Sequence, residues 1–529
     1  MRRTVLAVLG ILAASAEPSR AQGLFADAPA SASLEGAPRL GVVRSRPVRV
    51  RLGRIPGALA SEAARGVLPP RGHRLVLNLF EDVVVRARLT RSERQGRALV
   101  WAGKIEDQPL GDVVLAVVDG VLSGSAVWPG GAYRIRFDGS VHIVEELDHD
   151  QFPEDGCFRE VPWAVTAGDG APVANADDGS LIDLLVVYTP AARAAAGGTA
   201  AAMLSEINLA VAETNVAYAN SNVVQRLRLA GVAEVAYTES GTTSTAMSTD
   251  LNRVTGTSDG YMDSVHALRD AYHADLVQLL VTGYNNPSGA CGIAWLMSGN
   301  NPAFAPYAFS VVDLDCATGY YSFGHELGHN MGLNHARVDP VGTGAYSYSY
   351  GYKWTGYRTV MAYAPGTRIQ YFSNPNVLYG GNPTGVSEAS PSSAYNALSL
   401  NNTRVTVANW RQSPAPASIH VAVPNGGEAW SAGSTQDITW TSANLPAGAV
   451  VRISYSDGTA RGFTTNRTAS GAIASVPASQ GSYSWTVPFN TGSAWRVKLC
   501  VPGSSAPAHG ADSSCLASDT SNAPFSIVP

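Results

Sequence analysis

Charged side chains are scarce in this chain. Only 15% of its 529 residues are Asp, Glu, Lys or Arg, and the formal net charge is −5. Nucleic-acid and membrane-surface binding usually need clustered lysine and arginine, so this balance gives no support to either partner. After the N-terminal segment, no stretch reaches the roughly 18 uninterrupted apolar residues of a membrane-spanning helix. The sequence therefore predicts no transmembrane segment.

The apolar run at the N-terminus is short. Arg2 and Arg3 precede the apolar residues 5–14, and small residues follow at Ala16 and Ala21. This is the pattern of a secretory signal peptide, which we predict over residues 1–21 with cleavage after Ala16 or Ala21. The mature protein should be secreted.

Cysteine is also scarce, with five in the whole chain. Export allows disulfides to form. Pairing within each domain is the simplest assignment: Cys291 with Cys316, and Cys500 with Cys515. Cys157 is then left over.

Glycine (53) and proline (31) are plentiful, and the length suggests about three domains after the signal peptide. Residues 22–178 contain short alternating runs with Asp-Gly turns at 119–120 and 138–139, which predict a β-rich propeptide. Its His73, His142 and His149 are interpreted as ordinary surface or strand residues. Residues 167–179 are small, acidic and turn-forming, so we place the activation cleavage in or near this linker.

Two further domains follow the linker. Residues 179–413 alternate strands and helices, with strands at 181–188, 227–237 and 276–281 and helices at 199–219 and 261–272. This alternation predicts an α/β layer with a largely parallel sheet. Residues 414–529 contain evenly spaced short strands with Gly and Asn turns, which predict a β-sandwich.

One motif carries most of the functional information. His325 and His329 are four residues apart and share one face of a helix, and His335 follows after Gly332. Gly332 can end the helix and let the chain bring His335 back as a third zinc ligand. Three protein ligands leave one position open, as in a catalytic zinc site. Glu326 is then placed to act as general base on the water that the zinc holds.

A bare His-Glu-x-x-His also occurs by chance, but the spacing to Gly332 and His335 is more specific. With Met361 downstream, the motif resembles the metzincin clan of zinc endopeptidases, and within it the bacterial reprolysin-like members of the peptidyl-Asp metalloendopeptidase type. The resemblance implies one catalytic zinc held by His325, His329 and His335. It also implies that Met361 forms the Met-turn beneath the site.

The same resemblance implies an α/β catalytic domain with a mixed sheet and an active-site helix behind it, between a β-rich propeptide and an all-β C-terminal sandwich that resembles immunoglobulin-like modules. An antiparallel edge strand is expected along the cleft. Gly292, Ile293 and Ala294 begin the best candidate, which would pair with an extended peptide substrate. A plain core strand is the alternative.

Three residues have roles that the sequence leaves open. Tyr363, two residues after Met361, is expected to donate a hydrogen bond to the oxyanion of the reaction. Cys157 is a candidate zymogen switch that would bind the zinc, against an inert buried thiol or another disulfide. Arg368 would favour acidic side chains in a primed-side pocket walled by residues 364–373, or is an ordinary surface arginine.

The function predicted from these features is a secreted, zinc-dependent endopeptidase made as a zymogen and acting on proteins or peptides. The alternatives are an adhesin-like binding protein with a vestigial protease domain and a zinc hydrolase of a non-peptide substrate. The sequence does not show calcium sites, cleavage preference or the ligand of the C-terminal domain.

Overall fold

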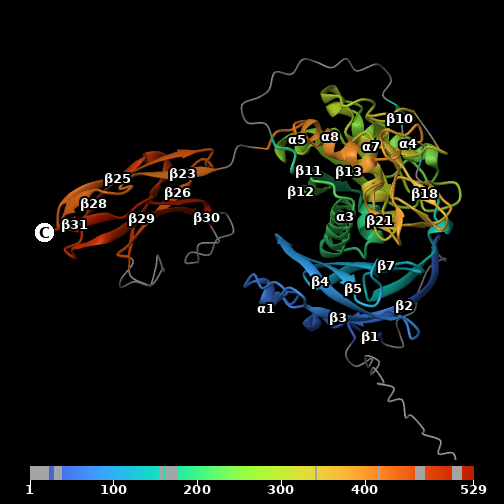
Figure 1. The fold of residues 1–529 in the computed structure, drawn as a ribbon, viewed down its shortest axis with the longest axis horizontal. Coiled ribbons are helices and arrows are strands. Elements are labelled where there is room, and N and C mark those ends of the chain that lie inside the picture. Colours follow the sequence, from blue (N-terminus) through green and yellow to red (C-terminus); the bar gives the residue numbers. More distant parts are fainter. Residues whose placement is uncertain are drawn as a thin grey trace, which may run out of the picture. The chain divides into compact units, whose positions relative to one another are not determined.

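The computed structural model describes residues 23–28, 39–154, 156, 159–160, 177–339, 342–413, 417–458, 471–502 and 515–529. The chain divides into two compact units, Met1–Ser413 and Pro414–Pro529 (Figure 1). The predicted signal peptide, most of the predicted cleavage linker and Cys157 lie outside the described residues.

The first unit begins with a nine-stranded antiparallel sheet, which forms the blue and cyan part of Figure 1. Its short runs alternate apolar and polar residues and meet at tight turns, as at Asp119-Gly120, where both residues have positive φ. In spatial order the strands are β1 (Phe25–Asp27), β2 (Val42–Val50), β9 (His142–Leu147), β8 (Gly131–Phe137), β7 (Val121–Trp128), β6 (Asp112–Val118), β5 (Ala98–Ile105), β4 (Val84–Gln95) and β3 (Arg74–Asn78). A short helix, α1 (Ala60–Ala63), lies between β2 and β3 in the chain.

A second, mixed sheet follows. Apolar runs form four parallel strands in the spatial order β12 (Arg226–Glu234), β11 (Leu181–Tyr188), β13 (Leu276–Val281) and β15 (Phe309–Asp313). Strand β14 (Gly292–Leu296) is antiparallel to β15. Its other side pairs in parallel with β10 (Arg159–Glu160), which comes from the N-terminal segment. The predicted mixed α/β layer is therefore present, and β14 is its last strand before the N-terminal segment.

Helices cover this sheet. They are α2 (Pro190–Ala195), α3 (Ala200–Asn220), α4 (Ser244–Thr255), α5 (Ser264–Ala271), α6 (Leu314–Ala317), α7 (Ser322–Asn330) and α8 (Asn396–Ala408). The sequence prediction began α5 three residues early and missed α4, whose serine- and threonine-rich sequence hides the buried Met247, Leu251 and Val254. Their i, i+4, i+7 spacing was the signal available.

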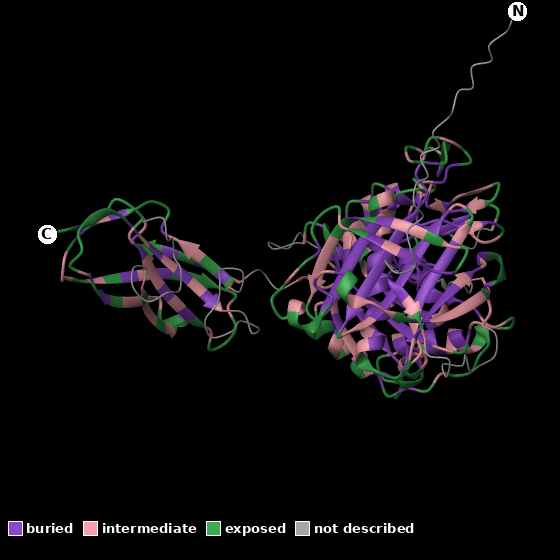
Figure 2. Cartoon of the chain, turned by 90° about the horizontal axis from the view of Figure 1, so that it is seen from below, coloured by how far each residue is buried: buried purple, intermediate pink, exposed green. Residues whose placement is uncertain are grey.

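Helix α3 lies between the two sheets. Leu209 and Ala212 on one face pack against Val100, Val114 and Ala116 of the N-terminal sheet. On another face Thr214 is so close to α7 that a Cβ on Gly324 would lie 2.9 Å from its Oγ1. Because both sides are covered, α3 is buried at most of its positions. Figure 2 shows the buried residues gathered in the interior of this unit. The buried polar side chains of α3, among them Glu206 and Asn215, are hydrogen bonded to neighbouring elements.

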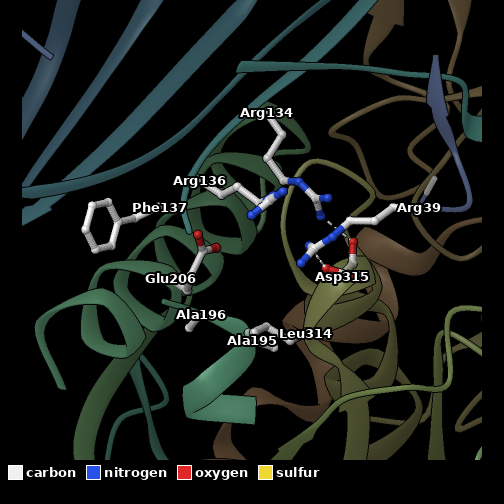
Figure 3. Close-up of a pocket in the computed structure, with 9 residues that line it drawn as sticks. All are labelled: Arg39, Arg134, Arg136, Phe137, Ala195, Ala196, Glu206, Leu314 and Asp315. Carbon is white, nitrogen blue, oxygen red and sulfur yellow. Dashed lines mark hydrogen bonds and ion pairs between the residues drawn. The ribbon is translucent and has the colours of Figure 1, made fainter. Parts of the chain in front are cut away.

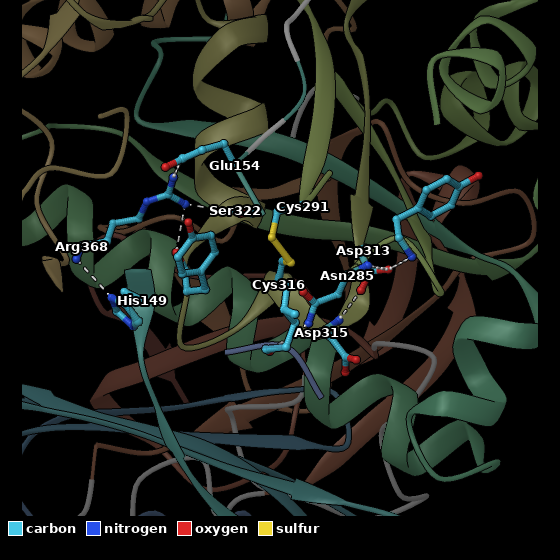
Figure 4. Close-up of a disulfide and its surroundings, with 12 residues drawn as sticks. His149, Glu154, Asn285, Cys291, Asp313, Asp315, Cys316, Ser322 and Arg368 are labelled. Carbon is cyan, nitrogen blue, oxygen red and sulfur yellow. Dashed lines mark hydrogen bonds and ion pairs between the residues drawn. A yellow bond between two sulfur atoms is a disulfide. The ribbon is translucent and has the colours of Figure 1, made fainter. Parts of the chain in front are cut away.

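After α7 the chain forms short strands that wall the site. These are β16 (Asn334–Ala336), β17 (Tyr350–Gly351), β18 (Lys353–Trp354), β19 (Tyr357–Arg358), β20 (Thr367–Arg368), β21 (Leu378–Tyr379) and β22 (Asn382–Pro383). A disulfide joins Cys291, next to β14, to Cys316 on α6, as predicted (Figure 4). It ties the edge of the mixed sheet to the segment that leads into α7.

The described residues of the second unit form two β-sheets and a single 3₁₀ turn at Ala478–Gln480. One sheet has the order β23 (Ser418–Val423), β25 (Thr435–Ala443), β28 (Ser482–Thr486). The other has β24 (Ala429–Ser431), β31 (Phe525–Val528), β29 (Gly492–Pro502), β26 (Val450–Ser456) and β27 (Ala472–Pro477), with β30 (Cys515–Thr520) paired to β29. Trp430, Trp440, Trp485 and Trp495 belong to one buried core, and Cys500 pairs with Cys515 as predicted. The immunoglobulin-like assignment stays a prediction.

Within the part of the chain that the structure describes, no helix is both long and apolar enough to span a membrane.

Candidate active site

Helix α7 carries the His-Glu-x-x-His motif and stops abruptly. Its last residue is Asn330, and Gly332 then takes a φ of 85°. A Cβ on Gly332 would lie 2.4 Å from the Cβ of Ala345. The position therefore needs glycine both for its backbone conformation and for space. The chain turns back at this point and brings His335, on β16, to the face of α7.

The three histidines meet at their Nε2 atoms. The Nε2 of His325 lies 3.1 Å from that of His329 and 3.2 Å from that of His335, and the third separation is 3.0 Å. Three imidazole nitrogens that bind one zinc at about 2.0–2.1 Å in a tetrahedral arrangement lie roughly 3.3 Å apart. The observed triangle is close to that spacing. All three side chains are fully buried.

The hydrogen bonds of the other ring nitrogens fix the orientation of two of these rings. The Nδ1 of His325 lies 2.8 Å from the carbonyl of Val360, and the Nδ1 of His329 lies 2.8 Å from the carbonyl of Leu333. A carbonyl accepts, so each Nδ1 carries the proton and each Nε2 presents a lone pair to the others. Converging lone pairs in a buried site repel one another unless a cation lies between them, so the residues fit a metal ion.

Glu326 lies beside the edge strand. Its carboxylate is buried on α7, and a Cβ on Gly292 of β14 would lie only 2.6 Å from its Oε1. Gly292 therefore leaves room for the carboxylate between the helix and the strand. A peptide that pairs with β14 would pass directly over this carboxylate.

Met361 and Tyr363 lie on the other side of the histidines. Met361 is fully buried and its sulfur would be 2.7 Å from a Cβ on Gly328, so it packs under α7 between the two histidines of the helix. The Tyr363 ring lies 4.0 Å from that of His335 and 6.2 Å from that of His325, centroid to centroid. The structure thus brings both predicted residues to the site.

We expect Tyr363→Phe to lower kcat by roughly tenfold or more while KM changes little, because a hydroxyl that binds the transition state contributes to turnover rather than to substrate binding. Steady-state kinetics on a peptide substrate measure both constants. Tyr352→Phe is the matched control, since Tyr352 belongs to the same region and stacks on Trp354 instead of the histidines. An unchanged kcat for Tyr363→Phe would reduce this residue to a packing role.

The N-terminal segment enters the cleft along β14. The carbonyl of Glu154 accepts a hydrogen bond from the Cys291 amide at 3.3 Å, and the Gly156 amide donates to the Gly292 carbonyl at 2.5 Å. Arg159 and Glu160 then pair with β14 as β10. The predicted edge strand is therefore occupied by the chain's own N-terminal segment, next to Glu326.

The opposite wall of the cleft contacts the same segment. Asp150 accepts a hydrogen bond from the Gly366 amide at 2.9 Å, and His149 Nδ1 accepts one from the Arg368 amide at 3.1 Å. Burial, with the nearby charges of Arg358 and Arg368, lowers the pKa of His149 to about 3. His149 is 4% exposed, so the interpretation of this residue as an ordinary surface or strand residue is wrong. The alternating pattern of the β-rich segment gave no sign that the chain would fold back over a second domain there.

A second charged contact joins the N-terminal part of this unit to α6 (Figure 3). Arg39 forms an ion pair with the carboxylate of Asp315 on α6, and Arg134 donates a hydrogen bond to the backbone carbonyl of the same residue. Ser123 of β7 donates to Glu206 of α3 at 2.8 Å. Burial raises the pKa of the Glu206 carboxyl. We interpret this contact as structural, because the Asp315 carboxylate is paired with Arg39 and Glu206 accepts a hydrogen bond from Ser123.

Sequence reasoning missed two site residues. Arg358 and Glu154 carry no motif, and each is recognisable only from its contacts. The sequence allows Arg368 to be either a pocket residue or a surface arginine. Its side chain is fully buried, which excludes the surface alternative.

Comparisons with known proteins agree with this geometry. Residues 180–390 match the model of the metallo-peptidase family M12B, reprolysin-like. That range contains the histidine triad, Glu326 and the edge strand. The chain is accordingly a zinc metalloendopeptidase with protein or peptide substrates, and neither the adhesin-like nor the non-peptide alternative is supported.

The relatives define the family more closely. A peptidyl-Asp metalloendopeptidase of Stenotrophomonas maltophilia is 40% identical over 319 residues, which is 58% of this chain and 72% of that protein. One of Xanthomonas campestris is 32% identical over 77% of this chain and 97% of its own length, and one of Pseudomonas fragi is 33% identical over 38% of this chain and all of its own. The chain belongs to the family of peptidyl-Asp metalloendopeptidases.

Proposed function

We propose that the chain is a secreted endopeptidase made as a zymogen, in which residues 22–178 are the prosegment, and that it cleaves next to aspartate, as the name of its relatives says of them. The observation that carries the zymogen proposal is the occupied cleft. Glu154 and Gly156 are hydrogen bonded to the start of β14, beside Glu326. A peptide substrate needs the same strand edge, so the prosegment and the substrate exclude each other.

The residues of the site have separable roles in this proposal. A zinc ion held by His325, His329 and His335 would polarise the peptide carbonyl and lower the pKa of a water molecule. Glu326 accepts a proton from that water and delivers it to the leaving amine. Tyr363 donates a hydrogen bond to the developing oxyanion.

Strand β14 and the Met-turn have positioning roles. The backbone of β14, from Gly292 through Ala294, holds the substrate extended by adding it as a strand, which tolerates many side chains. Met361 supports α7 from below. Residues 414–529 would be an accessory module without a part in the reaction.

A digestion assay tests the proposed function. The full chain, processed to remove the prosegment, should degrade casein or gelatin, lose this activity with a zinc chelator and regain it when zinc is added back. The new N-termini of the products identify the residue at the cleaved bond. Activity that persists in the chelator, or no cleavage at any aspartate, would contradict the proposal.

Cys157 remains the proposed switch of the zymogen. In sequence it follows Gly156, the residue hydrogen bonded to Gly292 beside Glu326, and the proposal assigns its thiol to the open zinc position. Zinc binds thiolate readily, at about 2.3 Å. In a precursor with an uncleavable linker, Cys157→Ala should raise activity on a small peptide by roughly tenfold or more.

The matched precursor carries Cys157→Ser, which keeps the size of the side chain but binds zinc weakly. It should be active to the same degree as the alanine variant. If both variants stay as silent as the unmutated precursor, inhibition is steric, and the thiol has no part in it.

A further inference from the structure

Two arginines are buried beside the cleft. Arg358 on β19 and Arg368 on β20 are both fully buried, and their strands pair side by side. Both guanidinium groups lie over the Tyr320 ring, Arg358 at 5.4 Å and Arg368 at 4.2 Å from its centroid. Burying two guanidinium cations away from water costs folding free energy unless an anion lies close to them.

The two side chains are used differently. Arg358 donates to the carbonyls of Ala362 and Gly366 at 2.9 and 2.8 Å, so it holds the loop that follows Met361. Arg368 donates through Nη1 to the Tyr320 carbonyl at 3.1 Å and the Ser322 hydroxyl at 3.3 Å. Its Nη2 lies 4.0 Å from Glu154 Oε2. Arg358 thus also positions the loop after Met361, whereas Arg368 can be replaced without loss of the hydrogen bonds that hold that loop.

The occupant in this structure is a carboxylate of the prosegment. Glu154 Oε2 lies 3.8 Å from Arg358 Nη1 and 4.0 Å from Arg368 Nη2, and its Oε1 accepts a hydrogen bond from the Ala364 amide at 2.6 Å. Figure 4 shows the Glu154 side chain reaching towards Arg368 and Ser322. The backbone of the same residue is hydrogen bonded to Cys291 at the start of β14. The backbone of Glu154 therefore pairs with the β14 side of the cleft, while its carboxylate lies next to Arg358 and Arg368 on the opposite side.

We propose that Arg368, held in place with Arg358, is the residue that selects an acidic side chain in the substrate, and that Glu154 occupies its pocket in the zymogen as an internal substitute for that side chain. The proposal rests on the proposed endopeptidase function and assigns the residues behind its preference. The chemistry required of the ligand is a short side-chain carboxylate on an extended peptide.

Selectivity follows from the cost of leaving the pocket without an anion. A neutral side chain would give neither guanidinium group a counter-charge, while a carboxylate would lie near both guanidinium groups and the Ala364 amide. A site with buried polar or charged groups discriminates strongly against a substrate analogue that lacks the matching group. An apolar pocket discriminates only weakly against a substrate that is shorter by one methylene group. Removing one partner of a buried charged pair costs roughly 30-fold or more in binding.

The first experiment compares two peptides that differ only in Asp against Asn at the position that sets the preference. The processed full-length enzyme should show a kcat/KM ratio, Asp over Asn, of roughly 30 or more. Arg368→Gln should bring that ratio close to one through loss on the Asp peptide, with the Asn peptide still cleaved. Arg368→Lys should restore part of the ratio, because it keeps the charge without the planar fork.

Arg269→Gln is the matched control. Arg269 is as fully buried as Arg368 and donates to backbone carbonyls in the same unit, but it lies on α5 and bonds Ala274, Asp275 and Ala305. The Arg269→Gln enzyme should keep the wild-type ratio of kcat/KM for the Asp peptide to kcat/KM for the Asn peptide. It should do so even if the yield of folded protein falls, because this ratio does not depend on the amount of active enzyme.

An Arg368→Gln enzyme with the wild-type ratio would overturn the proposal. A wild-type enzyme that cleaves peptides without acidic preference would also overturn it and leave the endopeptidase function standing, whereas no cleavage at all would instead refute the proposed function.

A second measurement needs no mutated enzyme. A synthetic peptide of residues 148–160, with Cys157 replaced by serine to remove any thiol effect, should inhibit the processed enzyme in competition with substrate. Its Glu154→Gln form should inhibit at least about tenfold more weakly, and its Glu154→Asp form should stay close to the parent peptide. Equal inhibition by the Glu and Gln peptides would refute the role of Glu154.

Discussion

Replacing Glu326 with glutamine should leave about one zinc per chain while kcat/KM on a peptide falls by roughly 10²–10⁴-fold, the usual range for loss of a positioned general base. The candidate metal ligands are the three histidine Nε2 atoms, and the amide keeps nearly the shape of the carboxylate that packs against Gly292. Metal binding and proton transfer thus depend on different groups. Metal analysis and steady-state kinetics on the same sample test both statements.

Glu213→Gln is the control for this change. Glu213 is another buried glutamate of the same unit, accepting from the Gly319 amide, and burial raises its pKa to about 8. It is therefore largely protonated at neutral pH, and a neutral amide should alter activity little. If Glu326→Gln lost its zinc, or kept the activity of the control, the role of Glu326 as general base would be refuted.

Gly292→Ala should be nearly as damaging, although it adds a single methyl group. The new Cβ would lie 2.6 Å from the Glu326 Oε1 and 2.6 Å from its Cγ. Since Glu326 is fully buried, it has little room to retreat without leaving the position from which it reaches the water. We expect kcat/KM to fall by roughly 10²-fold, the scale on which small displacements of catalytic groups act, with zinc content unchanged.

Gly256→Ala offers a matched comparison for the methyl group. Its Cβ would lie 2.6 Å from a carboxylate oxygen too, that of Asp259, but Asp259 is exposed and can rotate away. The two variants should therefore differ in activity by roughly the full loss expected for Gly292→Ala. Equal activities would show that Glu326 tolerates displacement and that Gly292 is not required for the site.

Local patterns predicted the elements around the zinc site. The bounds of β11, β13 and β14 agree with the predicted runs, because a buried strand is a short apolar run between turn residues. The triad was predictable because one turn of helix and one glycine turn fix where His325, His329 and His335 lie. Each of these signals is contained within about a dozen residues of sequence.

The contacts that cover the site could not be predicted in this way. Glu154 meets Arg358 and Arg368 across more than 200 positions of the chain. Arg368 was a candidate pocket residue from its place after Met361, but nothing in the sequence marks Glu154 or Arg358 as its neighbours. His149 was misjudged for the same reason, because its burial depends on a domain that folds elsewhere in the sequence. Residues that come into contact only through tertiary packing have no periodic pattern in the local sequence from which the contact could be predicted.

The layer formed by α3 and the N-terminal sheet has a consequence for how the enzyme is switched on. Leu209 and Ala212 pack on Val100 and Val114 through side chains alone, so in the proposed zymogen a cut in the linker would remove a tether without in itself separating the two surfaces. The proposed prosegment would act at an effective concentration in the millimolar range while tethered, and once cut it would obey an ordinary bimolecular equilibrium. Release then depends on dilution, or on digestion of the freed prosegment. A cleaved precursor kept at high concentration would stay inactive, and the same sample would become active after dilution.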